Sequence, residues 1–242
     1  MRPIHMRVIP TGTLSYTNIS LAQTPAAGGI QELTITGAFA AGGVATFTQA
    51  GTVDILTVAD ERSRVFVITG TSDKGYPLVE AVRGVGAALF ASSILAFRTV
   101  TSIKVDANTT GAVSAGWAGT TYGAVQPLDY INGIHDIGIT VAAIGDIAGT
   151  AGIRYTRANV LTKRRHNGTI QHRNPGYYAS EWDMFQPVTH DDWIPSGAYT
   201  ADSSTTIPGP VTAVRWSIPA GPITGTGDAE YRYNVTQASG IL

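Results

Sequence analysis

Short runs of apolar and β-branched residues recur along most of this chain, and turn-forming residues separate them. Helical periodicity is almost absent, so the runs indicate strands rather than helices. In Val65-Phe66-Val67-Ile68 both faces are apolar, which is typical of a central strand in a β-sandwich. Strands of this kind bury their apolar side chains by pairing into sheets that pack together. The pattern therefore predicts an all-β fold.

The first half of the chain contains about seven such runs, a number that suits one β-sandwich. We expect strands at residues 31–36, 44–49, 53–58, 64–69, 78–82, 100–105 and 112–117. Turns are predicted at Gly42-Gly43, at Asp60-Glu61-Arg62 and at Asp73-Lys74-Gly75. The run from Val85 to Phe97 is interrupted by two serines, and its pattern leaves open whether it is a buried helix or belongs to a strand.

A linker rich in Gly and Thr follows at residues 118–122, and a second series of strands is expected at 136–142, 152–162, 211–218 and 229–236. Residues 163–210 are polar and aromatic without a regular pattern, which predicts an elaborated loop that packs on something. We therefore predict two tandem β-sandwich domains, either jelly-roll-like or immunoglobulin-like. The expected division is an extended N-terminal arm at 1–26, a first domain at 27–120, and a second domain at 121–242 with a long loop insertion at about 163–210.

Ionised side chains are scarce in this chain. Charged residues make up 14% of it, against roughly 25% in an ordinary soluble domain. A surface with so few charges is expected to be covered by other protein, which predicts an assembly component. The formal net charge of −1 gives no electrostatic footprint for nucleic acid. No secretory signal is expected at Met1 to Pro10, and the longest apolar run is too short to span a membrane.

No sequence motif indicates catalysis, a cofactor or a metal. The glycines between Arg83 and Leu89 suggest a dinucleotide-binding loop, but Leu89 stands where the fingerprint needs a third small residue, so we expect a loop between strands. His190, Asp191 and Asp192 are metal-ligating residue types, yet their spacing matches no known ligand pattern. We expect that the protein is not an enzyme.

The candidate contacts to a partner lie in the 163–210 excursion. Its basic cluster is followed by acidic residues, so a solvated or intersubunit salt-bridge face is favoured over phosphate binding. Its aromatic side chains either form a platform that stacks on carbohydrate or anchor the loop to its own domain or a neighbour. The candidate contact residues are Arg164, Arg165, Tyr177, Tyr178, Trp182, Phe185 and Trp193.

Two stretches resemble recurrent patterns in structural proteins of tailed bacteriophages. Val67-Ile68-Thr69-Gly70-Thr71-Ser72-Asp73-Lys74-Gly75, leading through Leu78-Val79-Glu80 to Phe97-Arg98-Thr99-Val100-Thr101-Ser102-Ile103, is similar to their "TITGTDADGN…TETV…YFKTVTSI" run. The stretch from Pro210 to Ile218, followed by Gly225-Thr226-Gly227 and ending in Asn234-Val235-Thr236-Gln237-Ala238, is similar to their C-terminal "PVTAIRLxV…GTGTVTxTVIQAG" hairpin. The chain departs from the pattern at Tyr76-Pro77 and in its aromatic insertion.

The resemblance implies a non-enzymatic virion component, present in many copies and assembled in the host cytoplasm. We expect a capsid decoration or cement protein that bridges neighbouring subunits, with the major capsid protein and copies of itself as partners. No nucleic acid, membrane or cofactor is expected to take part. One alternative is a ring subunit of the tail or head–tail connector. An alternative from another class is a receptor- or glycan-binding module that uses the loop with Trp182 and Trp193.

Overall fold

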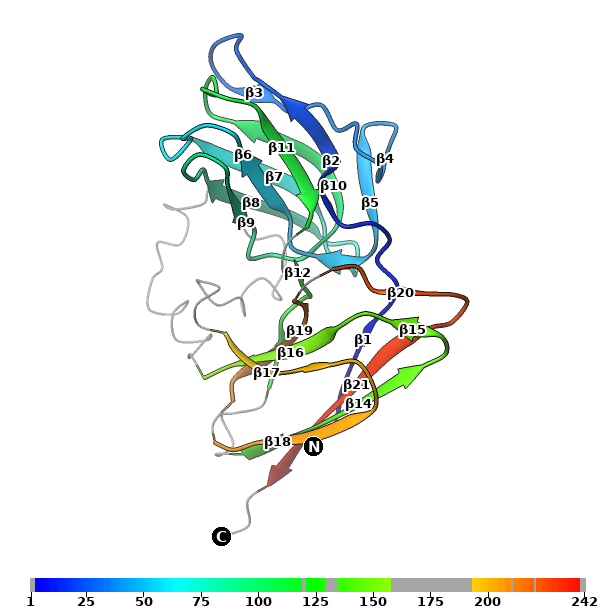
Figure 1. Ribbon diagram of the computed structural model, residues 1–242. Coiled ribbons are helices and arrows are strands. Elements are labelled where there is room, and N and C mark those ends of the chain that lie inside the picture. The colour runs from blue at the N-terminus through cyan, green and yellow to red at the C-terminus, as the bar shows by residue number, and fades with distance from the viewer. Residues whose placement is uncertain are drawn as a thin grey trace.

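The computed structural model describes residues 3–118, 121–128, 135–157, 193–209, 211–219 and 221–239. All the regular structure in these ranges is β-strand, which confirms the predicted all-β class. The strands gather in two lobes, one above the other in Figure 1. The first lobe contains β2 to β11, and the second lobe contains β1 and β12 to β21.

The first lobe contains two antiparallel sheets. The larger sheet has the order β4-β5-β10-β7-β8, and β3 also pairs with β10. Its strands are β3 (Gln31–Glu32), β4 (Ala40–Ala41), β5 (Val44–Gly51), β7 (Val65–Thr71), β8 (Pro77–Arg83) and β10 (Phe97–Val105). The second sheet has the order β2-β11-β6-β9. Its strands are β2 (Ser15–Gln23), β6 (Asp54–Thr57), β9 (Leu89–Ser92) and β11 (Val113–Trp117).

The second lobe is built in the same way from two main sheets and a short ribbon. One sheet has the order β1-β21-β14-β18, with β1 (Ile4–Val8), β14 (His135–Ile144), β18 (Ser203–Ile207) and β21 (Glu230–Ser239). The other has the order β12-β19-β16-β17, and β13 also pairs with β19. Its strands are β12 (Thr121–Tyr122), β13 (Gln126–Pro127), β16 (Ala151–Thr156), β17 (Ile194–Tyr199) and β19 (Ala213–Ile218). The ribbon is β15 (Ile147–Ala148) with β20 (Thr224–Gly225).

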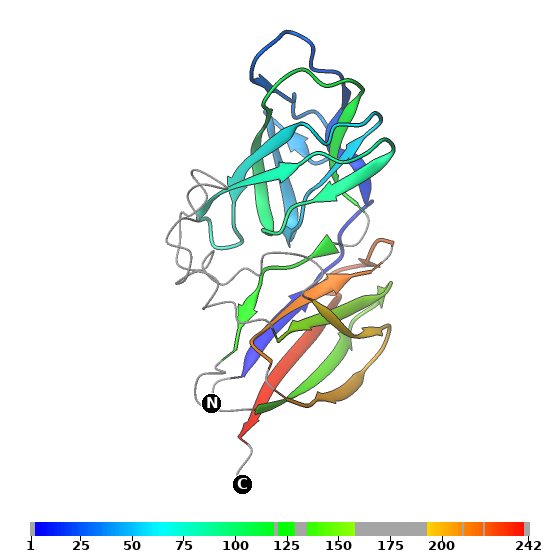
Figure 2. The ribbon, with the colours of Figure 1, turned by 90° about the vertical axis from the view of Figure 1, so that its left-hand side faces the viewer.

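The N-terminal residues belong to both lobes, which corrects the predicted arm at 1–26. Strand β1 pairs with β21 at the far end of the chain, from Ile4 opposite Val235 to Val8 opposite Tyr231. The chain then rises into the first lobe, where β2 pairs with β11 (Figure 2). Each strand is held because it buries apolar side chains, Val8 in the second lobe and Ile19 in the first. The first lobe is therefore inserted between β1 and the rest of the second lobe.

Two further differences concern segments without a clear strand pattern. The predicted loop insertion at about 163–210 ends in two strands, β17 and β18, which pair with β16 and β14. Both lie at sheet edges, where Pro195 and a run of Ser and Thr are tolerated, so their sequences carry little strand signal. The ambiguous run at 85–97 contains strand β9, and residues 84–88 form the expected Gly-rich connection between β8 and β9.

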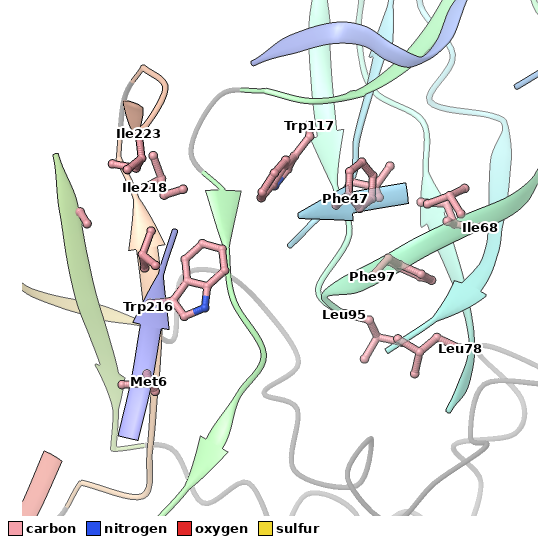
Figure 3. Packing of buried hydrophobic residues seen from close by; sticks show 14 of the residues in the cluster. Met6, Phe47, Ile68, Leu78, Leu95, Phe97, Trp117, Trp216, Ile218 and Ile223 are labelled. Carbon is pink, nitrogen blue, oxygen red and sulfur yellow. The ribbon is translucent and has the colours of Figure 1, made fainter. Parts of the chain in front are cut away.

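The lobes meet at a junction made of both apolar and polar contacts. One cluster of buried side chains includes Phe47 and Trp117 of the first lobe and Met6 and Trp216 of the second (Figure 3). The side-chain amide of Gln49 in the first lobe binds the segment that connects β1 to β2. Its Oε1 accepts a hydrogen bond from the Ile9 nitrogen at 3.1 Å, and its Nε2 donates to the Ile9 oxygen at 3.4 Å.

We expect Gln49→Met to lower the free energy of unfolding by about 1–3 kcal/mol, because methionine keeps the volume but leaves both backbone groups of Ile9 without their partner. Urea unfolding measures the change. The control is Gln126→Met, since the side-chain amide of Gln126 makes no hydrogen bond with the residues the structure describes. Equal stabilities of the two variants would contradict this role of Gln49.

Candidate functional site

A polar cleft of about 820 Å³ lies between the two lobes. Arg98 and Thr48 line it from the first lobe, and residues of β1, β14 and β21 line it from the second. The cleft also touches Ala124 and Gln126, which follow β12 in the chain, and residues from both faces of β1 contribute to its wall. It therefore runs along the edge of β1 as well as over the outer face of that sheet.

Strand register arranges the floor of the cleft in two rows across β1, β21 and β14. The side chains of His5 and Arg7 are exposed, while Met6 and Val8 point into the core. The rows run across the outer face of the sheet and consist of His5, Asn234 and Thr140, and of Arg7, Arg232 and Ala142. Arg7 and Arg232 thus stand directly opposite each other on neighbouring strands, a placement that repulsion between like charges disfavours.

The carboxylate of Glu230 offsets this repulsion. It is buried, its Oε1 accepts a short hydrogen bond from Nε of Arg232, and its Oε2 lies 3.8 Å from Nη1 of Arg7. The Arg98 side chain makes no hydrogen bond or ion pair with any residue that the structure describes. The three guanidinium groups face two carboxylates in the cleft, those of Glu230 and of Asp73. This balance favours an anionic ligand.

The first lobe carries a second candidate surface, which we call the β9 patch: Tyr16, Leu56 and Phe90, together with the exposed Leu89 next to Phe90 on β9 and the exposed Val58 that follows β6. Strand β9 is the last strand of its sheet, and Phe90 lies opposite Leu56 on β6. The ring of Tyr16 lies 5.3 Å from that of Phe90, and Val58, Leu89 and Phe90 are exposed. An exposed apolar edge strand is a ready surface for protein–protein contact.

Three buried carboxylates of the first lobe accept hydrogen bonds from nearby backbone nitrogens and so stabilise the fold. Glu80 accepts hydrogen bonds from the backbone nitrogens of Ile94 and Leu95 at 2.7 and 2.9 Å. Glu61 accepts from those of Thr110 and Gly111 at 2.5 and 2.9 Å. The third carboxylate, Asp54, has its pKa raised by burial to about 7. Because each carboxylate accepts hydrogen bonds from other residues of its own lobe, we assign no chemistry to them.

Trp193 is the one candidate contact residue that lies within the described ranges, and it is only 3% exposed. Its ring stacks against the guanidinium of Arg215, 4.3 Å from the ring centre, and the same guanidinium lies 3.9 Å from the ring centre of Tyr122. Burial lowers the pKa of Arg215 to about 9, so its charge persists at neutral pH. Trp193 thus packs within its own lobe, which agrees with the alternative that these aromatic residues anchor the loop to its own domain.

The other predicted contacts lie outside the described residues: Arg164, Arg165, Tyr177, Tyr178, Trp182 and Phe185. His190, Asp191 and Asp192 lie outside them as well. The cleft residues were not predicted. Arg7, Arg98 and Arg232 are far apart in the chain, and only the strand register brings two of them opposite each other. The Leu89-Phe90 pair was visible as an apolar run, but its position on an edge strand was not.

No protein-family model matches this chain, and no curated protein matches it. Within the ranges that the structure covers, no group of three His, Asp or Glu side chains is placed to hold a metal ion. The described segments contain no helix of the length and hydropathy needed to cross a membrane.

Proposed function

We propose that this protein is a non-enzymatic structural subunit of a bacteriophage virion, and that it decorates the capsid by bridging neighbouring subunits. The observation that supports this most directly is the β9 patch, an exposed apolar surface on an edge strand of a chain with 14% charged residues. Contact with another protein would remove this apolar surface from water, and the low charge reduces the cost of desolvating the surrounding surface. The resemblance of two stretches to tailed-phage structural proteins supports the same proposal.

The binding test uses preformed capsids that lack this protein. The wild-type protein is expected to sediment with the capsids and to raise their melting temperature. We expect Phe90→Ser to weaken binding by about 2 kcal/mol, or about 30-fold, because truncation of a central aromatic contact has an effect of this size.

Tyr76→Ser is the matched control, because Tyr76 lies outside the patch and is 43% exposed, against 44% for Phe90. Tyr76→Ser is expected to bind like the wild-type protein. Capsids that neither bind nor gain stability from the protein would contradict the decoration role. Gel densitometry then distinguishes a ring subunit, which would be present in a small fixed number of copies per particle, roughly six or twelve, because a ring closes after a set number of subunits.

A further inference from the structure

The contacts of Ile9, which directly follows β1, show which backbone groups of β1 point to its unpaired edge. Gln49 contacts both the nitrogen and the oxygen of Ile9, the two bonds that a neighbouring antiparallel strand would make with one residue. Along an extended chain these backbone groups alternate between the two edges. Ile9 directly follows β1, so the groups of Arg7 and His5 point to the same edge as those of Ile9. By the same alternation, the backbone groups of Met6 and Val8 point to the opposite edge, where β21 pairs with β1.

No strand among the described residues pairs with this edge, because β1 is the terminal strand of its sheet. Gln49 occupies the edge at Ile9 only. The edge at His5 and Arg7 opens into the cleft, which both residues line. A strand edge that opens into a preformed cleft can accept an extended segment of another chain through backbone hydrogen bonds.

The charges around this edge determine what such a segment should carry. Arg7, Arg98 and Arg232 line the cleft from three strands and both lobes. Glu230 already bridges two of these guanidiniums, and the Arg98 side chain has no partner among the described residues. Carboxylates are the side chains that guanidinium groups recognise best. A sugar would need an exposed aromatic ring, whereas the aromatic residues of the cleft wall, Trp216 and Tyr233, are buried.

We propose that the cleft between the lobes binds an extended acidic segment of a partner protein, which pairs with the free edge of β1 and places carboxylates on Arg98 and on the Arg7–Arg232 pair. This inference stands on the cleft alone and holds whether or not the chain belongs to a virion. It assigns a role to the placement of Arg7 opposite Arg232, since the repulsion between them is relieved further when an acidic ligand binds.

The first experiment is calorimetric titration of the whole protein with a short blocked peptide of alternating Glu and Val. We expect binding that weakens with added salt, and no binding of the matched peptide of alternating Lys and Val. Arg98→Gln is expected to weaken binding about tenfold or more, the effect of losing one charge-assisted hydrogen bond. Arg83→Gln is the control, because Arg83 contacts the backbone of Arg62 away from the cleft, and it should bind like the wild-type protein.

The second experiment tests the strand pairing itself. His5→Pro removes a backbone N–H from the free edge, whereas His5→Ala removes the imidazole only; proline is tolerated on edge strands. We expect the proline variant to bind the Glu–Val peptide about three- to tenfold more weakly than the alanine variant. Thermal unfolding of both variants shows that each is folded.

Three results would overturn the proposal. The first is no binding of the Glu–Val peptide, and the second is equal binding of the two His5 variants. The third is binding of citrate alone as tightly as the peptide, because the cleft would then be a site for small anions. None of these measurements uses a virion, so their failure is distinct from a failure of the proposed function.

Discussion

Trp117→Ala is expected to lower the free energy of unfolding by about 3–5 kcal/mol, the cost of truncating a fully buried aromatic residue. The side chain of Trp117 has no exposed surface and lies at the end of β11, where the first lobe meets the second. Its ring centre is 5.3 Å from that of Phe47 and 6.3 Å from that of Phe39. Gly51 makes room for the indole, since a Cβ at this position would lie 2.3 Å from its Nε1. Alanine would leave a cavity that this packed junction cannot close.

Urea unfolding followed by circular dichroism measures the loss. Trp117→Phe is the control, and it should cost clearly less than alanine. Phenylalanine keeps most of the aromatic packing and removes an indole N–H that has no acceptor among the described residues. A loss below about 1 kcal/mol for Trp117→Ala would contradict the central place of this residue in the core.

Asp54→Asn is expected to stabilise the protein at pH 8 by up to roughly 4 kcal/mol and to have little effect at pH 4. Burial raises the pKa of Asp54 from 3.8 to about 7, against the hydrogen bonds it accepts from Ser92 and the backbone of Ala118. Folded protein therefore retains a proton that the unfolded chain releases. The stability that this group contributes is fully present below about pH 4 and is lost as the pH rises through 7.

Asparagine abolishes this titration and retains the contacts, because its amide oxygen accepts from Ala118 and its nitrogen donates to the Ser92 hydroxyl. The measurement is the free energy of unfolding at pH 4, 6 and 8. Asp60→Asn is the control: hydrogen bonds from Arg62 lower the pKa of Asp60 to about 2, so it does not titrate in this interval. If the variant and the wild-type protein show the same pH dependence of stability, the raised pKa of Asp54 is contradicted.

Strands with strong local patterns were predicted well. The expected strands at 64–69 and 100–105 correspond to β7 (Val65–Thr71) and β10 (Phe97–Val105), because Val, Ile and Phe fill the positions that face the core. On β7 only alternate residues such as Phe66 and Ile68 are fully buried, although the apolar run suggested burial on both faces. The five residues of β1, which pair with β21, carry no such signal, because the strand is short and has His5 and Arg7 on its outer face.

The candidate sites were less accessible from the sequence than the strands. The aromatic excursion drew attention because of its composition, yet its described member, Trp193, is a buried anchor. The cleft depends on residues such as Arg7 and Arg232, which lie at opposite ends of the chain and are unremarkable in their local contexts. Composition identifies residue types, but a site forms only where strand pairing places them on one face.

The sequence by itself determined the all-β class and the position of most strands, because the alternation of side chains along a strand is a local property that neighbouring residues express. The tertiary structure decided the rest: that β1 pairs with β21, that the first lobe is inserted between these two strands, and that three arginines face one cleft. The physical reason is that the choice of strand partner depends on apolar area buried between segments distant in the chain. A shift of register by one residue would also move every side chain of β1 to the opposite face of its sheet.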